Sequence, residues 1–203
     1  LILNPSPIDL NDYQNIQQIP NSSHHFIAVN QRTNQEVIIS SSQSSLEAYI
    51  AHQIQLPGVS KIIGHYFFTG NIPDNFNFES IRCLPNIVFM EYFQNGNIEQ
   101  HVKAYLDSNG TNSLLTPTVR SKIIFGVAAT MKQIQNKNII LNNLYLNKVF
   151  LDNSLEPKIS NFSRAKFAIS TQYNSLAQPL DSECMYMAPE ILMDNDYYDT
   201  QTD

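Results

Sequence analysis

The stretch LNNLYLNKVFLD, residues 141–152, carries a polar loop that leads into a short apolar run. Residues 139–141 and 149–151 are β-branched or large apolar residues, which predicts two short strands on either side of the loop. Another short run, residues 158–160, predicts a third strand after a turn. This part of the chain therefore predicts small strands joined by a loop of polar side chains.

Helical patterns precede this loop. Thr116 is a cap residue followed by Pro117, which favours the first turn of a helix. The apolar residues after it recur every three or four positions, as on one face of an amphipathic helix. They are Val119, Ile123, Val127, Met131 and Ile134. A stripe of Ile98, Val102 and Leu106 predicts a shorter helix just upstream.

The first part of the chain is strand-like. Short apolar runs between polar turns predict strands at residues 13–19, 26–29, 36–39, 60–68 and 87–92. Residues 44–54 predict one helix, because apolar residues recur there at helical spacing behind a Ser-Ser cap. Strands and one helix, followed by helices and small strands, predict an α+β fold in two lobes.

Composition excludes several functional classes. The chain has 203 residues, a formal net charge of −6, and no basic run of the kind that binds nucleic acid. No apolar stretch is long enough to span a membrane, and the N-terminus does not resemble a signal peptide. With two Cys and no signal for a disulfide framework, we expect an intracellular, cytoplasmic setting.

Five segments together resemble the protein kinase domain family. MAPEIL at 187–192 matches the Ala-Pro-Glu motif that closes the activation segment, and KISNFS at 158–163 resembles the stretch around Asp-Phe-Gly. VFLD at 149–152 resembles the strand after the catalytic loop. VFMEY at 88–92 resembles the hinge between the lobes. LPGV at 56–59 resembles the turn after helix C. Each motif is weak alone, but their order and spacing are specific.

The resemblance implies a bilobal fold with an antiparallel β small lobe and a mainly helical large lobe. Residues 1–203 then form a single domain, with the small lobe and helix C in 1–93. Residues 94–203 form part of the large lobe, through the Ala-Pro-Glu motif. Asp203 resembles the start of the large lobe's central helix, so we expect a truncated, incomplete domain. Retained structural positions are Glu47, Phe162, Ala188, Pro189 and Glu190.

The groups that phosphoryl transfer needs in the small lobe are missing from the matching positions. The phosphate-binding glycines align with residues 20–25, which contain no Gly. Ser40 aligns with the strand Lys, and the first Lys of the chain is Lys61, after helix C. Glu47 aligns with the Glu of helix C, so its usual partner, the strand Lys, is missing from this chain.

The large-lobe positions are altered in the same way. Asn143 takes the position of the catalytic base, but a neutral amide cannot accept the hydroxyl proton. Lys148 and Asn161 take the two metal-binding positions, where an ammonium repels Mg²⁺ and an amide adds no charge. Residues 108–151 contain no Asp or Glu, so no shift of alignment supplies a base. We therefore expect no intact catalytic residue and no metal site.

The nucleotide pocket is expected to be filled. Its positions match Ile27, Ile38, Met90, Glu91 and Phe150. Ile38 replaces a small Ala, and Phe150 replaces a smaller apolar residue beneath the purine. Both changes add volume to a slot that admits a flat ring only when its walls are small.

We favour a catalytically impaired, pseudokinase-like domain that acts by protein binding or allosteric signalling. Its partners are expected to be proteins or neighbouring domains of a longer chain, without nucleic acid and without a cofactor. One alternative is a weakly active Ser/Thr or Tyr protein kinase that uses ATP and Mg²⁺. Another is a truncated fragment without function, which we expect to be poorly soluble and to expose apolar faces of the helix at 119–134.

Overall fold

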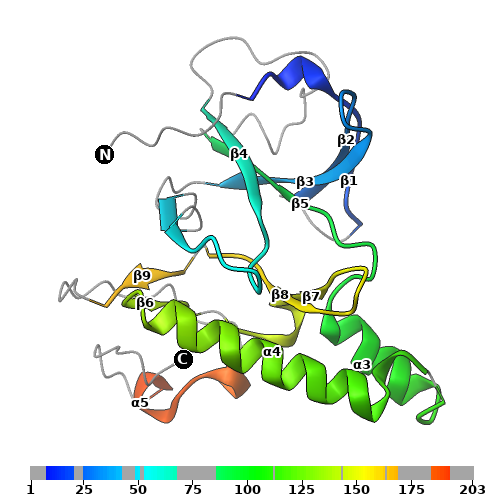
Figure 1. The fold of residues 1–203 in the computed structure, drawn as a ribbon, viewed down its shortest axis with the longest axis vertical. Helices are drawn as coiled ribbons and strands as arrows, with labels where there is room; N and C mark the ends of the chain where they lie inside the picture. The colour runs from blue at the N-terminus through cyan, green and yellow to red at the C-terminus, as the bar shows by residue number, and fades with distance from the viewer. Residues whose placement is uncertain are drawn as a thin grey trace. The chain divides into compact units, whose positions relative to one another are not determined.

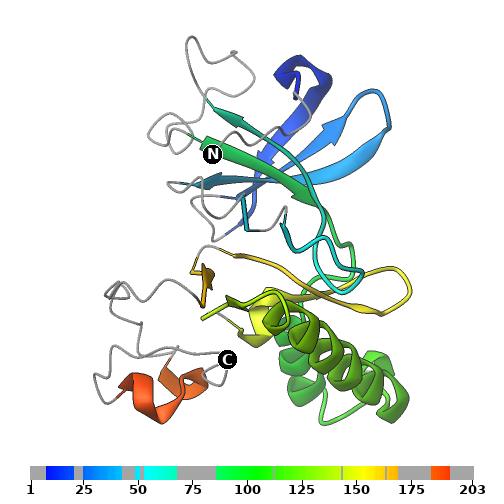
Figure 2. The ribbon, with the colours of Figure 1, turned by 60° about the vertical axis from the view of Figure 1, so that its left-hand side comes forward.

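The computed structural model describes residues 8–20, 25–42, 49–50, 53–67, 86–111, 113–142, 144–162, 164–168 and 184–192. The chain forms two compact units (Figures 1 and 2). The first unit comprises Leu1–Gln53 and Ser60–Tyr92, and the second comprises Ile54–Val59 and Phe93–Asp203.

A five-stranded antiparallel sheet makes up most of the first unit. Its order is β1-β2-β3-β5-β4, so β3 is the central strand. The strands are β1 (Tyr13–Gln18), β2 (His25–Asn30), β3 (Gln35–Ser42), β4 (Ile62–Phe67) and β5 (Asn86–Glu91). A 3₁₀ turn, η1 (Leu10–Asp12), precedes β1. All five predicted strands are thus found within a few residues of their expected bounds.

One face of this sheet carries the core of the first unit. Paired residues of an antiparallel ladder lie on the same face, and Phe26, Ile39 and Phe89 form one such row. All three are fully buried. Tyr13 packs against Phe89 with ring centroids 4.5 Å apart. The β-branched and aromatic residues of the short runs explain both the strands and their burial.

The predicted helix at residues 44–54 lies largely outside the described residues. Residues 49, 50 and 53 are helical, and Ile50 is fully buried.

The second unit contains helices followed by small strands. Its helices are α3 (Ile98–Asp107), α4 (Pro117–Gln135) and α5 (Pro189–Leu192), with 3₁₀ turns η3 (Ser113–Leu115), η4 (Leu146–Lys148) and η5 (Cys184–Tyr186). Its strands form two antiparallel pairs, β6 (Ile139–Ile140) with β9 (Lys166–Phe167) and β7 (Val149–Leu151) with β8 (Pro157–Ile159). The α+β class predicted from the sequence is confirmed.

Both long helices begin where the sequence predicts. Asn97 caps α3 in a reciprocal capping box with Gln100. The Thr116 side chain caps α4 by accepting a hydrogen bond from the backbone N–H of Val119 at 3.3 Å. No helix in the described ranges is long and apolar enough to cross a membrane.

The predicted apolar stripe of α3 is wrong at its last residue. Ile98 is buried and Val102 packs against the same cluster, but Leu106 is 66% exposed. Periodicity places Leu106 on the same helix face as Ile98 and Val102, yet this face is exposed at the end of the helix.

The segment Ile54–Val59 belongs to the second unit, although it precedes β4 in the chain. Val59 forms a parallel bridge with Ile159, and the Ile159 N–H donates to the Gly58 carbonyl at 2.8 Å. A Cβ at Gly58 would collide with the Thr130 side chain, so only Gly permits this approach to α4.

Candidate functional site

Ser40 lies in the central strand of the first unit. It pairs with His25 on β2 and with Val88 on β5, and it is 9% exposed. A neutral hydroxyl therefore occupies the position that the resemblance assigns to the strand Lys. Lys61 precedes β4 and is exposed.

Three of the five expected pocket positions form one cross-strand row. Ile27 pairs with Ile38, and Ile38 pairs with Met90. They lie on the sheet face opposite the buried row of Phe26, and all three are half-buried. The structure therefore brings these residues together as a continuous apolar strip.

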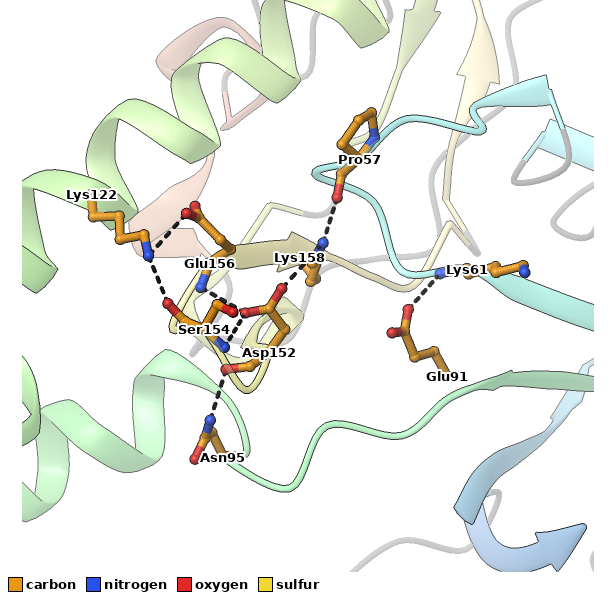
Figure 3. Close-up of polar contacts among 9 residues, drawn as sticks. All are labelled: Pro57, Lys61, Glu91, Asn95, Lys122, Asp152, Ser154, Glu156 and Lys158. Atoms are coloured by element: carbon orange, nitrogen blue, oxygen red, sulfur yellow. Dashed lines mark hydrogen bonds and ion pairs between the residues drawn. The ribbon is translucent and has the colours of Figure 1, made fainter. Parts of the chain in front are cut away.

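Glu91, the fourth pocket position, is engaged with the segment before β4. Its backbone N–H donates to the Lys61 carbonyl at 3.0 Å, and its carboxylate accepts from the Lys61 backbone N–H at 3.4 Å (Figure 3). Both contacts lie within the first unit and attach the end of β5 to this segment.

The polar loop at residues 141–148 is anchored at both ends to the segment that follows β8. At its start, the Asn142 side-chain amide donates to the Arg164 carbonyl at 3.4 Å. At its end, the Ser160 N–H donates to the Lys148 carbonyl at 2.9 Å. Asn143, the expected base position between these anchors, lies outside the described residues. Loop and segment therefore form one local assembly within the second unit.

Lys148 and Asn161 lie at the same end of the β7–β8 hairpin. Val149 pairs with Ile159, so the residues flanking this pair are close in space. Asn161 has a φ of 68°, a left-handed conformation that Asn tolerates better than most residues. The structure thus brings together the two expected metal positions.

These donors do not fit Mg²⁺. Magnesium bound to phosphates usually has at least one carboxylate ligand, whereas Asn161 offers a neutral amide oxygen and Lys148 a positive charge. Among the described residues, no three His, Cys, Asp or Glu side chains lie close enough to hold a metal ion. The residues at the two expected metal positions therefore lack the carboxylate that Mg²⁺ bound to phosphates usually has as a ligand.

Phe150, the fifth pocket position, is held against an aromatic neighbour. Its ring stacks on Phe93, with centroids 5.8 Å apart and planes inclined by 29°. Phe93 is 7% exposed, and the backbone of Phe150 bridges to Asn97. Such ring pairs contribute about 0.5–1.5 kcal/mol beyond the buried area. Sequence reasoning missed Phe93, whose signal was its place directly after the hinge-like stretch.

Asp152 organises the turn of the β7–β8 hairpin, a role that sequence reasoning also missed. Its carboxylate accepts from the backbone N–H groups of Ser154 at 2.8 Å and Glu156 at 2.9 Å, and pairs with Lys158 Nζ at 3.4 Å (Figure 3). Burial by itself raises the pKa of Asp152, but the two N–H donors and Lys158 outweigh it, so the pKa is lowered. The sequence Asp-Asn-Ser is typical of such a turn.

Two further contacts extend this network. Lys158 Nζ also donates to the Pro57 carbonyl at 2.6 Å, which attaches the segment Ile54–Val59 to the hairpin. Lys122 on α4 pairs with Glu156 at 2.9 Å (Figure 3). The carboxylates of the hairpin turn are therefore both neutralised by lysines.

The retained structural positions fall partly within the described residues. Phe162 is 3% exposed, Ala188 is half-buried, and Pro189 opens α5 and is exposed. Glu47 lies outside the described residues; Glu190 is helical, with its side chain outside the description.

A tyrosine pair joins the polar loop to the segment before α5. The rings of Tyr145 and Tyr186 lie 5.1 Å apart, and Tyr145 is 7% exposed. Tyr186, the residue just before the MAPEIL segment, is therefore packed on the loop that contains the expected base position.

Comparison with known proteins identifies the family. The family model described as protein tyrosine and serine/threonine kinase matches residues 27–203. The probable LRR receptor-like serine/threonine-protein kinase IRK of Arabidopsis thaliana is 29% identical over 104 residues, which is 51% of this chain and 10% of that protein. The serine/threonine-protein kinase CDG1 of the same plant is 31% identical over 107 residues, 51% of this chain and 24% of that protein.

The matched stretches thus cover a quarter or less of these two relatives. The family model, in contrast, covers most of the chain and includes all five segments that resemble the kinase domain. The chain therefore belongs to the protein tyrosine and serine/threonine kinase family.

Proposed function

We propose that this domain does not transfer phosphate and acts as a pseudokinase, through protein binding or allosteric signalling. The kinase fold of the domain is established, so the question concerns its activity alone. The answer rests on the residues at the positions that carry charge in the reaction.

The proposal rests mainly on the backbone hydrogen bond between Ser160 and Lys148, which lies where the two expected metal positions, Lys148 and Asn161, come together. A kinase needs Mg²⁺ at this end of the hairpin to neutralise the phosphates. Here an ammonium group and an amide occupy the metal positions, and residues 108–151 supply no carboxylate. The neutral Ser40 in β3 removes a further charge from the reaction. Each such loss typically costs several powers of ten in rate, so their combination leaves little activity.

The experiment is a phosphotransfer assay on the purified protein with radiolabelled ATP, Mg²⁺ or Mn²⁺, and a general protein acceptor. We expect no incorporation above the background without protein, either into the acceptor or into the chain itself. Incorporation that saturates with ATP and scales with the amount of protein would contradict the proposal.

The second candidate is a weakly active, ATP-dependent protein kinase, favoured by the names of the two relatives. It requires a nucleotide site, whereas the bulky Ile38 and Phe150 at expected pocket positions favour a filled one. The two candidates differ in thermal shift with millimolar ATP, with and without Mg²⁺. A rise in melting temperature that depends on Mg²⁺ favours the kinase. In the filled-pocket case the rise is absent.

A further inference from the structure

The chain contains two Asn-Gly pairs, Asn95-Gly96 and Asn109-Gly110. An asparagine followed by glycine can deamidate, because glycine has no Cβ to hinder the attack of its backbone nitrogen on the side-chain amide. In both pairs the glycine has a positive φ, 68° at Gly96 and 82° at Gly110. Both glycine N–H groups also donate to a backbone carbonyl in the folded chain. The two pairs therefore differ chiefly in what holds the asparagine.

Asn95 is held by groups from other parts of the second unit. Its side-chain amide donates to the Asp152 carbonyl at 2.7 Å, and its own carbonyl accepts a hydrogen bond from His101 Nε2 (Figure 3 shows the first of these). The next residue, Gly96, accepts from the Leu151 N–H at 3.0 Å. The turn at Asn95 can therefore open only by separating from both α3 and the β7–β8 hairpin.

Asn109 lies instead at the exposed end of α3. Its N–H donates to the Leu106 carbonyl at 3.1 Å, and the Gly110 N–H donates to the Tyr105 carbonyl at 2.8 Å. Both hydrogen bonds are local to the helix end. In the part of the chain that the structure describes, no group is hydrogen-bonded to the Asn109 side-chain amide. Asn109 is thus held by its own helix alone.

This helix end has little tertiary packing. Asn109 and Gly110 are exposed, and Leu106 in the last turn is 66% exposed. Helix ends fray, and segments with few buried contacts open at a much lower free energy than the core. Releasing the Gly110 nitrogen therefore requires only local opening, whereas releasing the Gly96 nitrogen requires long-range contacts to break.

We propose that Asn109 is a site of spontaneous deamidation in the native protein, whereas the fold protects Asn95. In the reaction the Gly110 nitrogen loses its proton and bonds to Cγ of Asn109, and the side-chain nitrogen leaves as ammonia. One water molecule then opens the five-membered imide and gives Asp or isoaspartate. The inference goes beyond the proposed function and does not depend on it.

The modification places a new carboxylate where the helix disfavours one. It lies two residues after Asp107, at the C-terminal end of α3. The carbonyl groups at a helix C-terminus carry a partial negative charge, which repels an anion. Deamidation of Asn109 should therefore loosen the end of α3 and add one negative charge to an already acidic chain.

The test follows both sites in the purified full chain during incubation at mildly alkaline pH. Trypsin separates them, because cleavage after Lys and Arg gives the fragments 83–103 and 104–120. Tandem mass spectrometry then measures the exchange of NH₂ for OH at each asparagine. In the native protein, Asn109 should deamidate about tenfold faster than Asn95 or more, because only its turn opens locally. In urea the two rates should agree within about twofold, since the contacts that hold Asn95 are lost.

Two variants test the cause. Asp152→Asn loosens the hairpin turn that holds Asn95, so it should raise the rate at Asn95 and leave the rate at Asn109 unchanged. Asn109→Gln should remove the product at residue 109 and leave the rate at Asn95 unchanged, and circular dichroism checks that both variants are folded. Equal native rates, a faster rate at Asn95, or a native difference that persists in urea would overturn the inference. So would a rate at Asn95 that Asp152→Asn does not change.

Discussion

Asparagine occupies several backbone positions with positive φ, a conformation that glycine usually adopts. Among the described residues, six of the seven non-glycine residues with positive φ are Asn. The Asn side chain can hydrogen-bond to its own neighbourhood, which offsets the cost of the left-handed conformation. Asn161 therefore does more than remove a charge, because it also takes a left-handed conformation in the segment after β8, as Asn142 does near the start of the polar loop. Sequence reasoning recognised the lost charge but not this conformation.

Asp152→Asn should destabilise the protein by about 1–2 kcal/mol, because it removes a charge-assisted acceptor of two N–H groups. The native pKa of Asp152 is lowered, so its stabilisation is fully present above the unfolded pKa of about 3.9. It is lost as the pH falls through the native pKa. The difference in Tm between wild type and variant should thus be constant from about pH 5 to pH 7.5 and shrink towards pH 3.

Asp107→Asn is the control for this measurement. Asp107 is exposed at the end of α3, so its replacement should change Tm little at any pH. A Tm difference for Asp152→Asn that persists undiminished at pH 3 would show that the carboxylate charge is not the cause.

At the scale of elements, local signals placed the helices and strands well. The Thr116 cap, the Pro117 start and the stripe of α4 all follow from propensity and periodicity, which act within a few residues. Which residues cover a helix face depends on contacts between distant parts of the sequence. Leu106 follows the α3 periodicity yet is exposed, because burial depends on neighbours distant in the sequence.

At Gly126, tertiary packing reverses the effect on stability that helix propensity predicts for a Gly→Ala substitution. In an exposed helix interior, Gly→Ala stabilises by about 1 kcal/mol. Here a Cβ would collide with the buried ring of Pro157 on β8, so Gly126→Ala should destabilise by about 1–3 kcal/mol in urea unfolding. In a Pro157→Ala background the same substitution should become neutral or stabilising, and a double-mutant cycle measures the coupling. Additive effects would show that the close approach of α4 and β8 is not the cause.

At the scale of the whole molecule, the kinase family and its two units are established, and each unit has its own apolar core. α4 also presents large apolar residues away from its buried stripe. Ile124 is 68% exposed and Phe125 is 76% exposed, whereas the neighbouring Ile123 is 8% exposed. The sequence stripe predicts the burial of Ile123 correctly. The exposed apolar residues of this helix lie beside the stripe, because the stripe itself packs against the core of the second unit.

The double variant Ile124→Gln with Phe125→Gln should reduce self-association, because two exposed apolar side chains are removed. Its free energy of unfolding should change by less than about 1 kcal/mol, since surface substitutions have small effects. Light scattering and urea unfolding measure the two quantities. Ile123→Gln should instead cost about 3 kcal/mol or more through lost burial and a buried amide. Equal destabilisation by the two variants would contradict the assigned helix face.

The sequence by itself determined the family and the order of the elements, and it showed uncharged or altered residues at the positions that the resemblance assigns to catalysis. These depend on residue identity and on local spacing, which can be read along the chain. Only the tertiary structure decided which residues meet. In the tertiary structure Phe93 stacks on Phe150, the Lys148 carbonyl accepts a hydrogen bond from Ser160, and Asp152 forms an ion pair with Lys158. Contacts between distant residues depend on how the elements pack, and no local pattern contains that information.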